Sequence, residues 1–247
     1  MGERSSRVSV LGADLVDGVF VFELNRPEAC NAISPDMVAA LNDALSRFES
    51  DDSAKVGVIT GAGSAFCAGL DLKVFAAADA DAERRTVGAL LRRFGRLTKP
   101  LIGAINGPAI AGGLELALSC DFLIGSPRAV FADTHVKIGA FPGAGLTARL
   151  SRAVGVRTAK AMGLAGLRLD ALAAKRAGLL AEVVEPDALM TRAHELAFNI
   201  ANADHHLILT LRKLYDANMS RSLDDALVAE QIELERWRQG SPRTWSA

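Results

Sequence analysis

The sequence predicts an α/β fold followed by a helical C-terminal part. A unit of one strand and one helix recurs over residues 19–48, 56–97 and 101–120. From about Leu146 onward the apolar residues follow helical spacing almost throughout. Half of the 247 residues are hydrophobic and they are spread along the whole chain, which is enough for a large core. These observations favour an α/β core, with most of the remaining helices after it.

The first unit begins with a strand over residues 19–24, which is rich in β-branched and aromatic side chains. Ser34 and Pro35 then predict the start of a helix, with Ser as N-cap and Pro at the first helical position. The apolar face of that helix comprises Met37, Leu41, Ala44, Leu45 and Phe48. A short buried strand over residues 56–60 opens the second unit.

The helix of the second unit has one apolar and one basic side. Its apolar face comprises Val87, Leu90, Leu91, Phe94 and Leu97, and Lys99-Pro100 ends it. The opposite side carries Arg84, Arg85, Arg92, Arg93 and Arg96. Such a face can bind phosphates, or it can simply be solvated. The next strand covers residues 101–105.

The stretch Gly107–Asp121 is the centre of the predicted chemistry. It is typical of a tight glycine turn that opens into a helix at Gly112 and Gly113, with Glu115 in the first helical turn. Backbone amides at a helix start can bind a carbonyl oxygen that becomes anionic, and a nearby carboxylate can move a proton. A helix cap with an ordinary first-turn Glu is the alternative. A second glycine turn, at Gly69-Leu70, could supply another amide to the same oxyanion hole.

Beyond this stretch, the sequence predicts short strands over residues 122–124 and 130–131 and a last one at 183–184. A helical apolar face then comprises Leu189, Ala193, Leu196, Ala197 and Ile200. Ser222 and Asp225 resemble a capping box for a final helix that reaches Trp237.

Composition argues against several classes of partner. The net charge of −1 gives no reason to expect nucleic acid or an anionic membrane as a partner, and no apolar run is long enough to span a membrane. The three cysteines are an odd number without metal-ligand spacing, and His194, His205 and His206 have no such spacing either. We therefore expect no metal and a reducing, cytoplasmic location.

One competing motif is present. Gly143–Ala148 fits the dinucleotide pattern G-x-G-x-x-A, with Asp170 at a tolerable distance, and would make the protein an NAD-dependent oxidoreductase. No clear strand leads into it, because Gly139 and Pro142 interrupt the preceding segment. Gly61-Ala-Gly63 has Phe66 where that pattern needs a third glycine, and no P-loop or G-x-S-x-G elbow occurs.

Four ordered motifs together resemble the enoyl-CoA hydratase/isomerase (crotonase) superfamily over roughly residues 15–240. They are Phe66–Asp71, Ile105–Ala117, Cys120-Asp121 and Pro142–Leu150. The resemblance implies a crotonase-like core of repeated ββα units, here residues 1–190, and a helical C-terminal trimerisation region, residues 191–247. It implies a homotrimer or a dimer of trimers, and no cofactor other than coenzyme A as part of the substrate.

The resemblance also implies roles for individual residues. The amides of Leu70 and Gly112 would form the oxyanion hole for the thioester carbonyl of an acyl-CoA. Glu115 falls on the first catalytic carboxylate, and Gly143 on a glycine whose amide helps to place the water. The residues that would border the CoA moiety are Arg26, Ala29, Ala68, Asp71 and Lys73.

The chain departs from the hydratase pattern at His135, where hydratases of this family have a second glutamate. His135 could be the second catalytic group, since an imidazole exchanges protons near neutral pH. Alternatively it only hydrogen-bonds Glu115, or it is turned away, and Asp133 is the displaced acid. The implied activity is hydration of 2-enoyl-CoA to 3-hydroxyacyl-CoA in fatty-acid metabolism. Double-bond isomerisation, another lyase or hydrolase reaction of the superfamily, and acyl-CoA binding without turnover are the alternatives.

Overall fold

A computed structural model describes residues 9–75 and 81–240. The chain divides into two compact units, Met1–Ala201 and Asn202–Ala247. The first contains a six-stranded sheet in the order β1-β2-β3-β4-β6-β9, in which only the β1–β2 pair is antiparallel. Its strands are β1 (Leu11–Val16), β2 (Val19–Leu24), β3 (Val56–Gly61), β4 (Leu101–Ile105), β6 (Phe122–Gly125) and β9 (Glu182–Val183).

A second sheet of three short strands has the order β5-β7-β8. Its strands are β5 (Ala109–Ile110), β7 (Val130–Ala132) and β8 (Arg168–Asp170). The pairing of β5 with β7 is parallel and places Ile110 opposite Ala132. The chain segment that contains His135 therefore leaves this sheet next to the segment that leads into Glu115.

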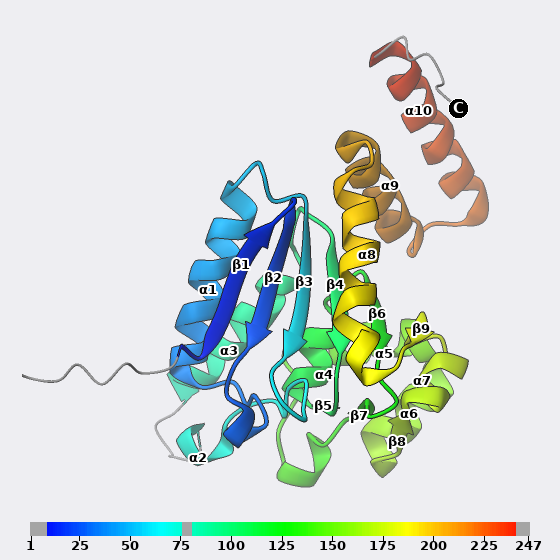
Figure 1. Ribbon diagram of the computed structural model, residues 1–247. Helices are drawn as coiled ribbons and strands as arrows, with labels where there is room; N and C mark the ends of the chain where they lie inside the picture. Colours follow the sequence, from blue (N-terminus) through cyan, green and yellow to red (C-terminus); the bar gives the residue numbers. More distant parts are fainter. Residues whose placement is uncertain (1–8, 76–80, 241–247) are drawn as a thin grey trace, which may run out of the picture. The chain divides into compact units, whose positions relative to one another are not determined.

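The helices of the first unit connect and cover these strands (Figure 1). They are η1 (Pro27–Ala29), α1 (Pro35–Ser50), α2 (Leu72–Phe75), α3 (Asp81–Phe94), α4 (Gly112–Ala117), η2 (Val136–Ile138), α5 (Leu146–Val154), α6 (Val156–Ala165), α7 (Ala171–Arg176), η3 (Pro186–Ala188) and α8 (Leu189–Ala201). The second unit consists of α9 (His205–Asn218) and α10 (Leu223–Gly240). None of the helices within the described residues is long and apolar enough to cross a membrane.

The large sheet is buried on both faces, as expected for a mainly parallel sheet. Successive side chains of a strand point to opposite faces. Thus Phe20 and Phe22 of β2 belong to the core cluster that includes α1 and α3, whereas Val19 belongs to a second cluster. In that second cluster α8 contributes Leu189, Ala193 and Ala197.

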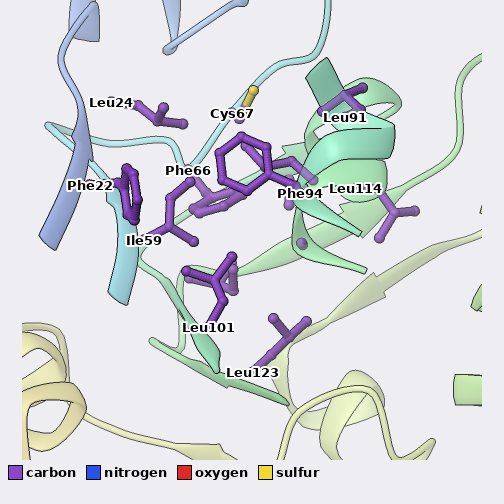
Figure 2. Close-up of a cluster of buried hydrophobic side chains, with 14 of the residues drawn as sticks. Phe22, Leu24, Ile59, Phe66, Cys67, Leu91, Phe94, Leu101, Leu114 and Leu123 are labelled. Atoms are coloured by element: carbon purple, nitrogen blue, oxygen red, sulfur yellow. The ribbon is translucent and has the colours of Figure 1, made fainter. Parts of the chain in front are cut away.

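The larger cluster anchors the helix that carries Glu115. Phe22 packs edge-on against Phe48, with ring centroids 5.6 Å apart, and against Phe94, at 6.2 Å. Figure 2 shows Leu114 of α4 beside Phe94 and Leu91 within this cluster. Because Leu114 is fully buried, α4 cannot rotate without opening a cavity in the core.

Most of the elements predicted from the sequence are confirmed. Ser34 caps α1 by accepting a hydrogen bond from the Met37 amide, and Ser222 accepts one from the Asp225 amide at the start of α10. Three strands were not predicted, β1, β5 and β8. β1 forms a hairpin with β2 through Asp17-Gly18, a sequence typical of two-residue hairpin turns that should have indicated it. β8 has only three residues, too few to show a period of two.

Other predictions need correction at their boundaries. The expected tight turn before Gly112 contains the two-residue strand β5. Helix α3 ends at Phe94, not at Lys99, although Leu97 is buried as predicted. The basic face of α3 is partly used in packing: Arg93 donates to the carbonyl and side-chain oxygens of Asn42 on α1.

Lys99 has an unusual position, because its ammonium group is buried at the end of α1. Nζ donates to the carbonyl oxygens of Phe48 and Asp51, each at 2.7 Å, and lies 5.4 Å from the centre of the Phe48 ring. The terminal carbonyls of a helix lack intrahelical partners, and Lys99 supplies one. Burial lowers the pKa of Lys99, although the nearby acids Glu49 and Asp52 oppose this shift.

We predict that Lys99→Met destabilises the protein by about 1.5–3 kcal/mol, because it keeps the apolar stem but leaves the Phe48 and Asp51 carbonyls without their charged donor. Chemical denaturation would measure the loss. Lys55→Met is the matched control: Lys55 also donates to a backbone carbonyl, that of Asp52, but at an exposed position. The control should change stability by less than about 0.5 kcal/mol. Equal losses in the two variants would contradict the capping role.

Candidate active site

Two loops of the first unit pack backbone against backbone. The amides of Phe66 and Cys67 both donate to the Pro108 carbonyl at 3.1 Å, and the Ile110 amide donates to the Cys67 carbonyl at 2.9 Å. A Cβ atom on Gly113 would lie 2.0 Å from the Cys67 oxygen. No residue with a side chain fits at position 113, so glycine is required for this approach.

This contact brings the two predicted oxyanion amides together. Gly69 has a φ of +90°, and a Cβ atom on it would lie 3.1 Å from the Gly112 nitrogen. A Cβ atom on Gly112 would lie 3.7 Å from the Leu70 nitrogen. Among the described residues, neither the Leu70 nor the Gly112 N–H group has a hydrogen-bond acceptor. Two neighbouring amides without partners are what an oxyanion requires.

The residue before Gly112 has a rarely populated backbone conformation. Ala111 has a φ of 49° and a ψ of −112°, which is unfavourable for a residue with a side chain. Its amide donates to the Ala132 carbonyl at 2.9 Å, and its own carbonyl accepts from the Glu115 amide. These bonds hold the Gly112 amide at the point where α4 begins.

Glu115 lies in the first turn of α4 and is only 3% exposed. Its Oε1 accepts a hydrogen bond from the Ala144 amide at 2.7 Å. The Glu115 carbonyl accepts one from the Ser119 hydroxyl at 2.8 Å, and Arg149 donates to that hydroxyl in turn. The buried carboxylate is therefore held from the loop before α5, which leaves Oε2 for other contacts.

His135 faces Glu115. Its Nε2 lies 4.0 Å from Oε2 of Glu115, and its Nδ1 lies 2.7 Å from Oδ1 of Asp133. Asp133 and His135 are each 6% exposed. His135 is thus neither turned away from Glu115 nor directly hydrogen-bonded to it. The three buried titratable groups form a row in the order Asp133, His135, Glu115.

The residues expected to border CoA also come together, and the Lys73 amide donates to Oδ1 of Asp71 at 3.2 Å. Arg26 is paired with Asp71, Nη2 to Oδ2 at 2.9 Å, and donates through Nη1 to the Ala32 carbonyl. The Ala68 amide donates to the Cys30 carbonyl, next to Ala29 in η1. Lys73 is exposed on α2. Because Asp71 directly follows Leu70, the Arg26–Asp71 pair also fixes the loop with the Leu70 amide.

Gly143 is exposed, and its carbonyl accepts a hydrogen bond from Arg92. The backbone amide that donates to the Glu115 carboxylate is that of Ala144, the residue after Gly143. This donor was not predicted from the sequence. A backbone donor leaves no mark in the side-chain pattern, so only the fold could reveal it. The dinucleotide alternative at Gly143–Ala148 lacks its strand: within the described residues η2 and an irregular segment precede it.

Metal and thiol chemistry have little support at this site. Across residues 9–75 and 81–240, no group of three or more His, Cys, Asp or Glu side chains is arranged to hold a metal ion. Burial raises the pKa of the Cys67 thiol to about 12. Burial, and secondarily the charge of Asp121, also raises the pKa of Cys120. These thiols stay protonated, and so unreactive, at neutral pH.

The fold and the site define an α/β protein in which the Leu70 and Gly112 amides, without acceptors among the described residues, lie at the start of the helix that carries the buried Glu115. The family model for enoyl-CoA hydratase/isomerase matches residues 14–240. The chain belongs to this family, as the resemblance in the sequence implied. Its fold matches the crystal structure of an enoyl-CoA hydratase from Bacillus anthracis with a TM-score of 0.85 and 33% identity, covering 92% of this chain and 90% of that one.

Curated relatives agree with this assignment. The chain is 35% identical, over 227 residues, to the Arabidopsis thaliana protein named "Probable enoyl-CoA hydratase 1, peroxisomal", covering 90% of this chain and 84% of the relative. It is 36% identical to the short-chain-enoyl-CoA hydratase of Clostridium acetobutylicum, covering 86% of this chain and 83% of the relative.

We predict that one of the three thiols reacts quickly with a disulfide reagent at about pH 8, because Cys30 is exposed, whereas Cys67 is buried, Cys120 is half-buried, and the pKa values of both are raised. Counting the thiols before and after unfolding would test this. A Cys30→Ser variant should lose the fast reaction. Rapid labelling of Cys67 in the folded protein, identified by mass spectrometry, would contradict its burial.

Proposed function

We propose that this protein hydrates 2-enoyl-CoA to 3-hydroxyacyl-CoA. The observation that carries the proposal is the approach of Glu115 to His135, two buried proton-transfer groups 4.0 Å apart, with Glu115 in the first turn of the helix that begins at Gly112. The names of the relatives, all enoyl-CoA hydratases, support the same reaction.

Each residue of the site has a separate role in the hydration. The amides of Leu70 and Gly112 bind the thioester carbonyl oxygen. The oxygen of a water forms a bond to C3 while one of its O–H bonds breaks, and the C2=C3 π electrons move toward the carbonyl oxygen as an enolate forms. C2 then takes a proton. Glu115 and His135 share the two proton transfers, and the amides stabilise the negative charge of the enolate.

Hydration is favoured over double-bond isomerisation by the presence of the second group. A 1,3-proton shift needs one carrier, which Glu115 could supply alone. Hydration needs a proton removed from water and another delivered to carbon. A buried imidazole aimed at the carboxylate suits that second requirement. The same two groups argue against an acyl-CoA-binding protein without turnover.

For the CoA moiety we propose the surface formed by Arg26, Ala29, Ala68, Asp71 and Lys73. Arg26 is committed to Asp71, so its main contribution is to hold the loop that ends at Leu70. Lys73 is the exposed cation of the set and would interact with the phosphates of CoA. Gly143 remains a candidate for water placement, next to the Ala144 amide that binds Glu115.

We predict that Glu115→Gln lowers kcat with crotonyl-CoA by about 100- to 10,000-fold, because the amide cannot exchange the proton. The loss of absorbance of the conjugated thioester measures turnover. Affinity for butyryl-CoA, which has no double bond, should stay near that of the unchanged protein, because the carboxylate does not hold the carbonyl. Glu23→Gln, at an exposed position on β2, is the matched control and should keep full activity. Near-normal turnover by Glu115→Gln would refute the assignment.

We further propose that the chain forms a homotrimer or a dimer of trimers through the helical region 191–247. Large apolar side chains are exposed along α9 and α10, more than isolated surface residues would explain. They are Leu211, Tyr215, Met219, Leu223, Leu227, Val228 and Ile232. The cytoplasmic location expected from the sequence stays a prediction; one relative is peroxisomal by name.

Sedimentation of the purified protein should therefore give the mass of a trimer or hexamer. The double variant Leu227→Asp/Ile232→Asp places two charges on the apolar face of α10 and should shift the protein toward a smaller species. Glu230→Asp, on the same helix, is the control and should leave the mass unchanged. A monomer at all concentrations of the unchanged protein would contradict the proposal.

A further inference from the structure

The hydration proposed above uses Glu115 and His135 and leaves a third buried acid, Asp133, without a role. We infer that Asp133 is a positioning residue that keeps a proton on Nδ1 of His135, so that Nε2 is the nitrogen that exchanges protons opposite Glu115. The inference rests on the proposed function for its catalytic consequence. The protonation pattern itself is a property of the folded protein.

The hydrogen bonds define which atom donates. Oδ1 of Asp133 accepts from the backbone amide of His135 at 3.0 Å and contacts Nδ1 of the same residue at 2.7 Å. An ionised carboxylate can only accept, so the short contact to Nδ1 requires a proton on that nitrogen. The neutral ring then carries no proton on Nε2, which lies 4.0 Å from Oε2 of Glu115.

The backbone fixes this arrangement. Strand β7 ends at Ala132, and the short helix η2 begins at Val136 with His135 at its N-terminal boundary, so Asp133 and His135 lie in one tight connection. The Ala132 carbonyl accepts from the Ala111 amide, which ties this connection to the start of the helix with Glu115. On the other side, a Cβ atom on Gly163 of α6 would lie 3.3 Å from Oδ2 of Asp133. The carboxylate therefore has little room to turn.

The chemical consequence follows from the two nitrogens of imidazole. When His135 accepts a proton at Nε2, the N–H bond forms there, Nδ1 keeps its own proton, and the ring becomes a cation between two carboxylates. When it donates, the Nε2–H bond breaks and the ring returns to the Nδ1–H form. The Asp133 carboxylate contacts Nδ1–H in both forms and stabilises the cation. A separation of 4.0 Å allows one water or substrate hydroxyl to contact both Nε2 and Oε2 of Glu115.

A purely structural role for Asp133 would be to close the turn by binding the His135 amide. If Asp133 only closed the turn, the fold would be the same, but the tautomer of the His135 ring would not matter. The amide and Nδ1 reach the same oxygen, so in Asp133→Asn one neutral side-chain oxygen can still accept from both, whereas Asp133→Ala removes the acceptor. The ring tautomer, compared in these two variants, therefore separates the two roles, because closing the turn does not by itself select a tautomer.

The experiment is nitrogen NMR of protein labelled with ¹⁵N in the ring of histidine, without ligand. The chain has four histidines, and a His135→Gln variant assigns the signal of His135. We expect the Nδ1–H tautomer in the unchanged protein and a shift toward Nε2–H in Asp133→Ala. Asp133→Asn, which keeps an oxygen acceptor, should retain more of the Nδ1–H form than Asp133→Ala. Asp170→Ala is the matched control, because Asp170 also binds a backbone amide, that of Ala173, and its loss should leave His135 unchanged.

Turnover of crotonyl-CoA supplies the second readout. Asp133→Ala should lower kcat by about 100- to 10,000-fold with little change in KM, because the ring is present but carries its proton on the wrong nitrogen. An Nε2–H tautomer in the unchanged protein, or an unchanged tautomer and kcat in Asp133→Ala, would overturn the inference. If the tautomers are as expected but the protein does not hydrate crotonyl-CoA, the role of Asp133 stands and the proposed reaction is refuted. Should Asp133→Ala not fold, the tautomer of the unchanged protein still decides.

Discussion

The backbone contact between Cys67 and Gly113 determines how the two oxyanion amides lie relative to Glu115. The Cys67 carbonyl accepts from the Ile110 amide, and Gly113 leaves no space for a side chain against the same oxygen. This approach places Leu70 next to Gly112. It also directs Leu114 into the core, so that Glu115, the next residue, is buried at a fixed angle around α4. A single close contact thus joins the oxyanion amides to the carboxylate.

The sequence predicted the elements whose residues carry a repeating pattern. Helices α1, α3 and α8 show apolar residues at helical spacing over two or more turns, and β2 is rich in β-branched and aromatic residues. The strands β5 and β8 have two and three residues, so their pairing, not their composition, makes them strands. The glycine turns were recognised because a requirement for glycine is visible in a sequence, whereas the partners of those turns are not.

Some residues of the candidate site could likewise be predicted from the sequence, and others could not. Glu115, Leu70 and Gly112 could be placed from motifs. The Ala144 amide could not, since any residue except proline would supply the same donor. The Arg26–Asp71 pair joins residues 45 positions apart, and nothing local connects them. Asp133 was visible only as an acid near His135. Its contact with Nδ1 depends on the conformation of the chain between β7 and η2, which a short stretch of sequence does not determine.

The resemblance implies that His135 stands where hydratases of this family have a glutamate, and a histidine there changes what the surroundings must supply. The two oxygens of a carboxylate are equivalent, so either one can face a substrate. The two nitrogens of a neutral imidazole are not equivalent, since one carries a proton and the other a lone pair. A histidine in this position needs a partner that selects between them, and the backbone connection that presents His135 to Glu115 also presents Asp133 to Nδ1. The substitution and its partner are therefore best understood as one unit, Asp133-Thr134-His135, and not as the loss of a catalytic acid.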